Sequence, residues 1–124
     1  LDMDFHVLTD IADDMNVMDF EQQTLGKRNL LKQIPSRYRT TYFNHTMGGG
    51  YTAGYYSYMW AEVLDADAYE AFKETGDIFN LEVADKFRKY VLTPGGIDDA
   101  MDMYKNFRGK EPGIEPLLKN RGLK

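Results

Sequence analysis

Short helical segments separated by glycine and proline make up this chain, and no strand-length run of alternating apolar and polar residues competes with them. Within most segments, apolar residues recur three and four positions apart, which is the spacing of a helix face. The segments that we expect to be helical are 1–11, 16–26, 52–64, 67–76, 80–92, 98–109 and 116–122. The pattern therefore predicts a multi-helix, all-α fold with short connections.

Capping residues mark where several of these helices begin and end. Asn16, Asn80 and Asp98 each stand where a side-chain oxygen can accept from the free backbone N–H groups of a first turn. Asp67, followed by Glu70, resembles a capping box. Pro116 suits the first turn of the last helix. The expected helix stops are Gly26, Gly76, the 93–96 break, Gly109 and Gly122.

Composition excludes several classes of function. The chain has 124 residues, with 20 acidic and 15 basic side chains, so its net charge is −5. That balance argues against a nucleic-acid partner. The chain has no Cys, which excludes disulfides, Cys-based zinc sites and a Cys nucleophile. No apolar run reaches the roughly 20 residues that a membrane helix needs, so we expect no membrane partner. Absence of Cys fits a cytoplasmic protein, with the periplasm left open.

Charge is segregated along the first half of the chain. Among Asp, Glu, Lys and Arg, only the acids Asp and Glu occur before Lys27, and residues 22–61 contain no acid at all. The bases in that stretch are Lys27, Arg28, Lys32, Arg37 and Arg39. One interpretation is that these bases pair with the acids of the first helices. The other is that they face an anion such as a peptide carboxylate.

A tyrosine-rich segment, residues 45–60, holds the candidate chemistry. If a helix begins near Tyr51, then Tyr51, Tyr55 and Tyr58 stand at i, i+4 and i+7 and share one face. A phenol with a pKa near ~10 is a hydrogen-bond donor at neutral pH. Such donors suit an oxyanion that develops on a polarised carbonyl. The neighbouring face, expected to join the core, consists of Tyr56, Met59, Trp60 and Val63.

A glycine run and a histidine precede these tyrosines. Gly48, Gly49 and Gly50 would let the backbone pass close to a bound peptide. His45 can hold a substrate backbone or donate a proton. The alternative is an aromatic helix face whose hydroxyls bond internally.

No metal site is visible in the chain. His6 and His45 are its two histidines, and neither belongs to a His-Glu-x-x-His helix. We expect His6 to be a structural histidine within its helix. Arg37 and Arg39 flank Tyr38, and both carboxylate binding and structural pairing are open to them.

The tyrosine-rich segment also resembles a known family. The matching residues are Tyr42-Phe43-Asn44-His45, Gly49-Gly50-Tyr51 and the run from Ala53-Gly54-Tyr55 to Trp60. Further likeness lies in Leu1-Asp2-Met3 with His6, Ile34 to Arg39, Asp67-Ala68-Tyr69, Gly95-Gly96, Phe107-Arg108-Gly109 and Arg121-Gly122-Leu123. Across essentially its whole length the chain resembles the thimet oligopeptidase family of zinc peptidases. Within that family it is most similar to the bacterial peptidyl-dipeptidases, which release dipeptides from peptide C-termini.

This resemblance implies roles for individual residues. The residue matching His45 contacts the substrate backbone, and those matching Tyr51 and Tyr58 hydrogen-bond the scissile carbonyl. The residue matching Tyr55 lies beside the substrate. The matching loop, Gly48–Gly50, is mobile and closes over the peptide. The chain departs from the usual family pattern at Thr46-Met47, where a larger apolar pair is common.

The resemblance also implies a larger protein. Residues 1–124 would be the C-terminal segment of a mostly helical, zincin-type catalytic domain. Its zinc would be held upstream by a His-Glu-x-x-His helix and a later Glu, and zinc-activated water would attack the peptide carbonyl. The isolated segment is then expected to be inactive and to self-associate through apolar surface. Its partners would be small peptides. The alternative is a stand-alone helical module that binds peptides or partners without catalysis.

Overall fold

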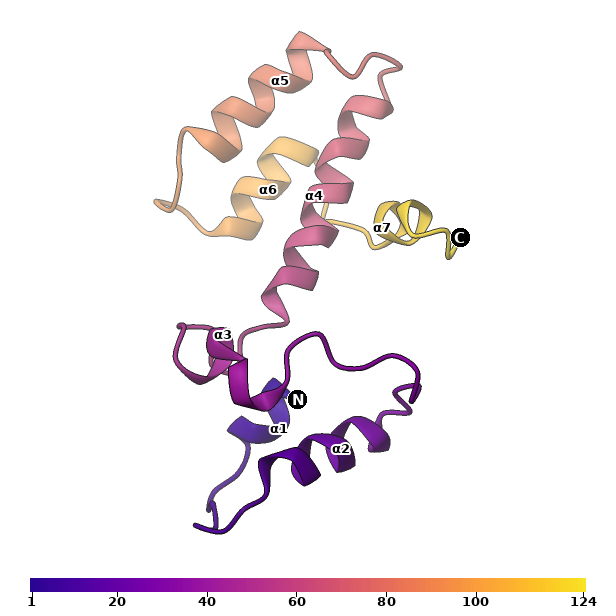
Figure 1. Ribbon diagram of the computed structural model, residues 1–124. Helices are drawn as coiled ribbons and strands as arrows, with labels where there is room; N and C mark the ends of the chain where they lie inside the picture. The colour runs from indigo at the N-terminus through magenta and orange to yellow at the C-terminus, as the bar shows by residue number, and fades with distance from the viewer. The chain divides into compact units, whose positions relative to one another are not determined.

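The computed structural model describes all 124 residues as helices and connecting turns, without strands, which confirms the all-α prediction. The chain divides into two units, Leu1–Ser57 and Tyr58–Lys124. Figure 1 shows their helices, and each unit is described by itself. No helix combines the length and the apolar character that crossing a membrane requires.

The first unit contains three α-helices and one 3₁₀ turn, which are α1 (Asp2–His6), α2 (Val17–Lys27), η1 (Thr40–Tyr42) and α3 (Asn44–Met47). The predicted cap at Asn16 is confirmed, since its side-chain oxygen accepts from the N–H groups of Met18 and Asp19. Gly26 does not end α2 but lies inside its last turn, and the helix continues to Lys27.

Helix α1 is shorter than the sequence predicts. The apolar pattern runs to residue 11, yet the helix ends at His6. The stripe of Met3, Val7 and Ile11 is 47–67% exposed, so nothing in the unit buries it. Short helices depend on the packing of their apolar face for stability. Because the apolar stripe of α1 is not buried, the helix does not continue beyond His6.

Polar side chains dominate the interior of the first unit. Its buried residues are Asp2, Glu21, Thr24, Phe43 and Thr46. Each of the two carboxylates accepts hydrogen bonds from backbone N–H groups far along the chain. The unit is therefore organised by hydrogen bonds between distant segments as much as by apolar contact.

The second unit contains α4 (Ser57–Lys73), α5 (Leu81–Phe87), a π-helical turn η2 (Arg88–Leu92), α6 (Ala100–Arg108) and α7 (Glu115–Asn120). The first residue of α4, Ser57, is counted with the first unit. Asn80 caps α5 as predicted. The cap of α6 is Asp99 and not the predicted Asp98, because the Asp99 carboxylate accepts from Met101 and Asp102. Gly109 ends α6 in the left-handed conformation at φ 78°, as expected.

Helix α4 replaces the two helices expected over 52–64 and 67–76. It is continuous from Ser57 to Lys73, so Asp67 is an interior residue and not a cap. The Asp67 carboxylate, 2% exposed, accepts from the Tyr104 hydroxyl at 2.5 Å and from Arg108 Nε at 3.2 Å. Partners on α6 thus satisfy the carboxylate that the sequence pattern assigned to a helix start.

The core of the second unit forms between α4 and α6. Val63, Ala66 and Ala71 are buried on α4, and Tyr104 and Phe107 are buried on α6. Burial raises the pKa of the Tyr104 phenol, and its bond to Asp67 raises it further, so this hydroxyl stays a donor. The prediction that Tyr56, Met59, Trp60 and Val63 form a core face is wrong in part. Val63 is buried, but Tyr56, Met59 and Trp60 are exposed.

Candidate functional site

The glycine loop folds back on α3 and brings Tyr51 to His45. The Tyr51 N–H donates to the His45 carbonyl oxygen at 2.9 Å, and the Thr52 hydroxyl donates to the Thr46 carbonyl oxygen at 3.0 Å. Thr46 itself is fully buried. As a result, the rings of His45 and Tyr51 lie 5.9 Å apart between centroids. Two of the residues predicted for the site are thus adjacent.

Two of the three glycines are required by this loop. A Cβ on Gly49 would lie 2.8 Å from the Asn44 carbonyl oxygen and 2.9 Å from the His45 Cα, which is too close for any other residue. Gly50 has φ +83°, a left-handed conformation that favours glycine. The glycines therefore have a structural function, which is to pack the loop against α3. Their predicted contact with a bound peptide stays a prediction.

The expectation that Tyr51, Tyr55 and Tyr58 share a helix face is wrong. Residues 51–56, here called the tyrosine turn, are not helical, and α4 begins only at Ser57. Within the turn, Ala53 has φ +52°, which no right-handed helix contains. Sequence spacing gave no sign of this conformation, since Ala is a good helix former.

Tertiary contacts nevertheless gather three of the predicted residues. The His45 ring lies 5.9 Å from that of Tyr51, 5.7 Å from that of Tyr55 and 5.3 Å from that of Tyr38. The Phe43 ring meets Tyr55 edge-on at 4.8 Å and stacks on Tyr38 at 5.4 Å. We call these five residues the aromatic cluster. His45 is half-buried in it, and Tyr51 is 36% exposed.

Tyr38 is a member of this cluster that the sequence did not single out for the site. Its sequence signals were its position between two arginines and its place in the run from Ile34 to Arg39 that shares the family likeness. In the structure the guanidinium of Arg37 lies 5.2 Å from the centre of the Tyr38 ring, a cation–π contact.

Tyr58 was predicted for the site together with His45, Tyr51 and Tyr55. It lies in the first turn of α4 and is the first residue of the second unit. Its side chain is 46% exposed. The predicted donor group is thus at the surface of its unit.

A buried carboxylate holds the tyrosine turn in place. The oxygens of Asp2 accept from the backbone N–H of Ala53 at 3.0 Å and from that of Tyr55 at 2.9 Å. His6 Nδ1 lies 2.9 Å from the same carboxylate, which is consistent with its predicted structural role. No sequence pattern indicated that an acid in the first helix serves residues more than fifty positions away.

A second buried carboxylate holds the segment that leads into α3. Glu21 accepts from the Thr40 N–H at 2.8 Å, from the Thr40 hydroxyl at 2.9 Å and from Arg39 Nε. Arg28 pairs with Asp4 on α1. The interpretation that the basic stretch pairs with acids of the first helices is therefore confirmed for Arg28 and Arg39.

A groove of about 440 Å³ lies beside the aromatic cluster in the first unit. Tyr38, Phe43 and Tyr55 line it, together with Leu1, Asp2, Met3, Leu25, Ser36, Arg37 and Tyr56. Of the residues predicted to bind substrate, only Tyr55 reaches this groove.

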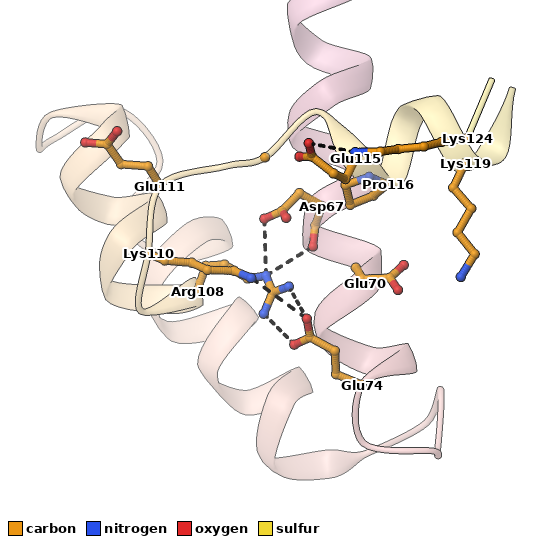
Figure 2. A pocket seen from close by; sticks show the side chains of 11 residues that line it. Asp67, Glu70, Glu74, Arg108, Lys110, Glu111, Glu115, Pro116, Lys119 and Lys124 are labelled. Atoms are coloured by element: carbon orange, nitrogen blue, oxygen red, sulfur yellow. Dashed lines mark hydrogen bonds and ion pairs between the residues drawn. The ribbon is translucent and has the colours of Figure 1, made fainter.

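Another pocket, of about 610 Å³, lies in the second unit. Figure 2 shows Arg108 between Asp67 and Glu74, with its guanidinium bonded to both Glu74 oxygens at 2.7 Å. Lys124 pairs with Glu115 on another wall. None of the predicted site residues lines this pocket, and its central arginine is already matched by carboxylates. The chain contains no group of three or more His, Cys, Asp or Glu side chains that could hold a metal ion.

Comparison with known proteins identifies the family. The model of peptidase family M3 matches residues 1–123. Dipeptidyl carboxypeptidases of Salmonella typhimurium and Escherichia coli are each 43% identical over 124 residues, which cover 99% of this chain and 18% of each relative. Oligopeptidase A of Salmonella typhimurium is 50% identical over 82 residues, 66% of this chain and 12% of the relative. The chain belongs to peptidase family M3, and the resemblance stated from the tyrosine-rich segment is confirmed.

The chain spans less than a fifth of the length of these relatives. The family match covers nearly every residue of this chain.

The bonding around Glu21 predicts a pH dependence. Burial alone would raise the Glu21 pKa, but the Thr40 N–H and hydroxyl and the Arg39 guanidinium together hold the pKa below its ordinary value of 4.5. A lowered folded-state pKa means that the stabilisation is complete above the unfolded-state pKa and is lost as the pH falls through the folded-state pKa. Stability should therefore decline below about pH 4.5.

Glu21→Gln tests this expectation. At neutral pH the free energy of unfolding of the variant should be lower than that of the wild type by about 2 kcal/mol, because the variant loses charge-assisted hydrogen bonds. It should also lose the part of the acid sensitivity that Glu21 contributes. Urea denaturation from pH 3 to 7, compared with that of Asp19→Asn on the same helix, measures both effects. Parallel pH curves for the wild type and Glu21→Gln would contradict the assignment.

Proposed function

We propose that this chain supplies substrate-binding and oxyanion-stabilising groups to an M3 peptidase that hydrolyses short peptides and releases C-terminal dipeptides. The observation that carries the proposal is the aromatic cluster, in which His45, Tyr51 and Tyr55 lie together in a chain of peptidase family M3. The names of the 43% identical relatives, dipeptidyl carboxypeptidases, support dipeptide release.

The proposed division of labour follows from the chemistry of the side chains. A phenol is a neutral donor, so Tyr51 and Tyr58 can each donate to a carbonyl oxygen, and the bond strengthens as negative charge develops there. His45, half-buried beside Tyr51, binds the substrate backbone. Tyr55 contacts the substrate from the same cluster. Gly48, Gly49 and Gly50 leave the loop without side chains where the peptide passes.

The metal of the reaction would belong to the remainder of the protein. No set of residues in this chain fits a zinc ion, because no group of three ligating side chains is present. We therefore place the zinc ligands and the general base outside these residues, and assign to this chain only the binding and donor functions. A cytoplasmic location fits the absence of Cys and is part of the same proposal.

Tyr58→Phe tests the donor function in the full-length protein. Removing one oxyanion donor should lower kcat by about 10²- to 10³-fold. KM should change much less, because the lost bond is stronger in the transition state than in the ground state. Steady-state kinetics on a short peptide measures both constants. Tyr56→Phe, which removes an exposed hydroxyl two positions away, is the matched control. A Tyr58→Phe enzyme with normal kcat would remove Tyr58 from the chemistry.

The isolated 124-residue chain separates catalysis from simple peptide binding. We expect it to bind no stoichiometric zinc and to release no dipeptide, because it lacks a ligand set. Metal analysis after dialysis and chromatography of peptide digests check the two expectations. Dipeptide release by the purified chain would refute the assignment of the zinc and the base to other sequence.

We also propose that the isolated chain self-associates. Large apolar side chains are exposed at the start of α4, where Met59 and Trp60 are each about half exposed. Surface of this kind favours association. Size-exclusion chromatography with light scattering should show species larger than 14.3 kDa that increase with concentration. A monomer at the highest concentration would count against the proposal.

A further inference from the structure

We propose that Asp2 is a positioning residue for catalysis, because its carboxylate holds the backbone turn from which Tyr51 and Tyr55 project. The inference rests on the proposed function, since it concerns the same tyrosines. It adds a residue to which neither the sequence pattern nor the family resemblance assigned a role.

The first step is the geometry of the contact. The two oxygens of the Asp2 carboxylate are divided between two backbone donors, with Oδ1 3.0 Å from the Ala53 nitrogen and Oδ2 2.9 Å from the Tyr55 nitrogen. The two donors stand on either side of Gly54. One carboxylate therefore clamps both ends of the central part of the tyrosine turn.

The second step is the strength of the clamp. Asp2 is 7% exposed, so water competes poorly for its oxygens. Hydrogen bonds from N–H groups to an ionised carboxylate are shorter and stronger than those between neutral groups. His6 Nδ1, 2.9 Å from Oδ1 and 2.8 Å from the Asp2 carbonyl oxygen, fixes the carboxylate from its own helix.

The third step is why the turn needs a clamp. Ala53 has φ +52°, a left-handed conformation that is unfavourable for a residue with a Cβ and that persists only where the surroundings impose it. The Ala53 N–H is one of the two groups that Asp2 binds. Without the carboxylate, Ala53 would return to its preferred right-handed region, and the backbone at Tyr55 would turn with it.

The fourth step connects the turn to the site. The Tyr51 and Tyr55 rings both contact His45, within 6 Å between centroids. A rearranged turn would move these rings relative to His45 and relative to a bound peptide. Since misplacement of about 1 Å can cost about 10²-fold in rate, a residue that never touches substrate can control turnover in this way.

Helix α1 offers a matched control for the same charge change. Asp4 lies one half-turn from Asp2 and pairs with Arg28, which is largely exposed, at 2.9 Å. Asp4→Asn removes a carboxylate from the same helix without touching the tyrosine turn. Asp2→Asn retains the size of the side chain but replaces one acceptor oxygen with an amide NH₂ that cannot accept.

The experiment uses the full-length peptidase with three readouts. Asp2→Asn should lower kcat about 10- to 100-fold with a smaller change in KM, whereas Asp4→Asn should retain wild-type constants. Hydrogen exchange measured by mass spectrometry should accelerate in the peptide that covers residues 50–56 and should not accelerate in α2. In a Tyr51→Phe/Tyr55→Phe background, Asp2→Asn should cost less than in the wild type, because it acts through those side chains.

Each alternative result overturns the proposal. Equal kcat for the two Asn variants, or full additivity with the tyrosine substitutions, would show that Asp2 does not act through the turn. Faster exchange spread over α2 as well would show a general structural role. Should Asp2→Asn not fold, exchange in the wild type decides, because unprotected amides at Ala53 and Tyr55 would exclude the clamp. A wild-type enzyme that cleaves no peptide would instead refute the proposed function, while the exchange data would still test the clamp.

Discussion

Buried carboxylates that accept backbone N–H groups organise the part of the chain that contains the aromatic cluster. Asp2 binds the tyrosine turn, and Glu21 binds the segment that leads into α3. A buried carboxylate is costly unless its oxygens are matched, and here backbone donors, a threonine hydroxyl, a histidine and an arginine match them. The cost of leaving either acid unmatched ties α1 to the tyrosine turn and α2 to the segment that leads into α3, around an interior that contains little apolar material.

The second unit uses the same device within a more conventional core. Asp67 accepts from Tyr104 and Arg108, and Arg108 is also held by both oxygens of Glu74, so a guanidinium joins α6 to Asp67 of α4 and to Glu74 just after the end of α4. Beneath this network, apolar side chains of α4 and α6 pack, and Phe87 meets Phe107 edge-on at 5.2 Å. In this network the Arg108 guanidinium is paired with the carboxylates of Asp67 and Glu74. The mixed-charge pocket of Figure 2 is therefore a structural feature of the unit.

The aromatic cluster combines rigidity with accessible polar groups. Phe43 is buried and packs against Tyr38 and Tyr55, whereas His45 and Tyr51 reach the surface. The Tyr51 N–H donates to the His45 carbonyl oxygen, and the Asp2 carboxylate accepts from the N–H groups of the following turn. These bonds fix the backbone on both sides of the loop glycines. Membership of family M3 gives this arrangement its proposed chemistry, in which neutral phenol donors surround a peptide carbonyl. The activating metal would come from other parts of a much longer protein.

The sequence by itself determined the all-α class, the caps at Asn16 and Asn80, the stop at Gly109, and the family through the run from His45 to Trp60. These features depend on residues within a few positions of one another, so local chemistry is enough to specify them. Only the tertiary structure decided that α4 begins at Ser57, that Asp67 is interior, that Tyr38 joins the aromatic cluster and that Asp2 binds the tyrosine turn. Each of these depends on a partner far along the chain, and helical spacing contains no information about a carboxylate that arrives from fifty residues away to hold Ala53 at a positive φ.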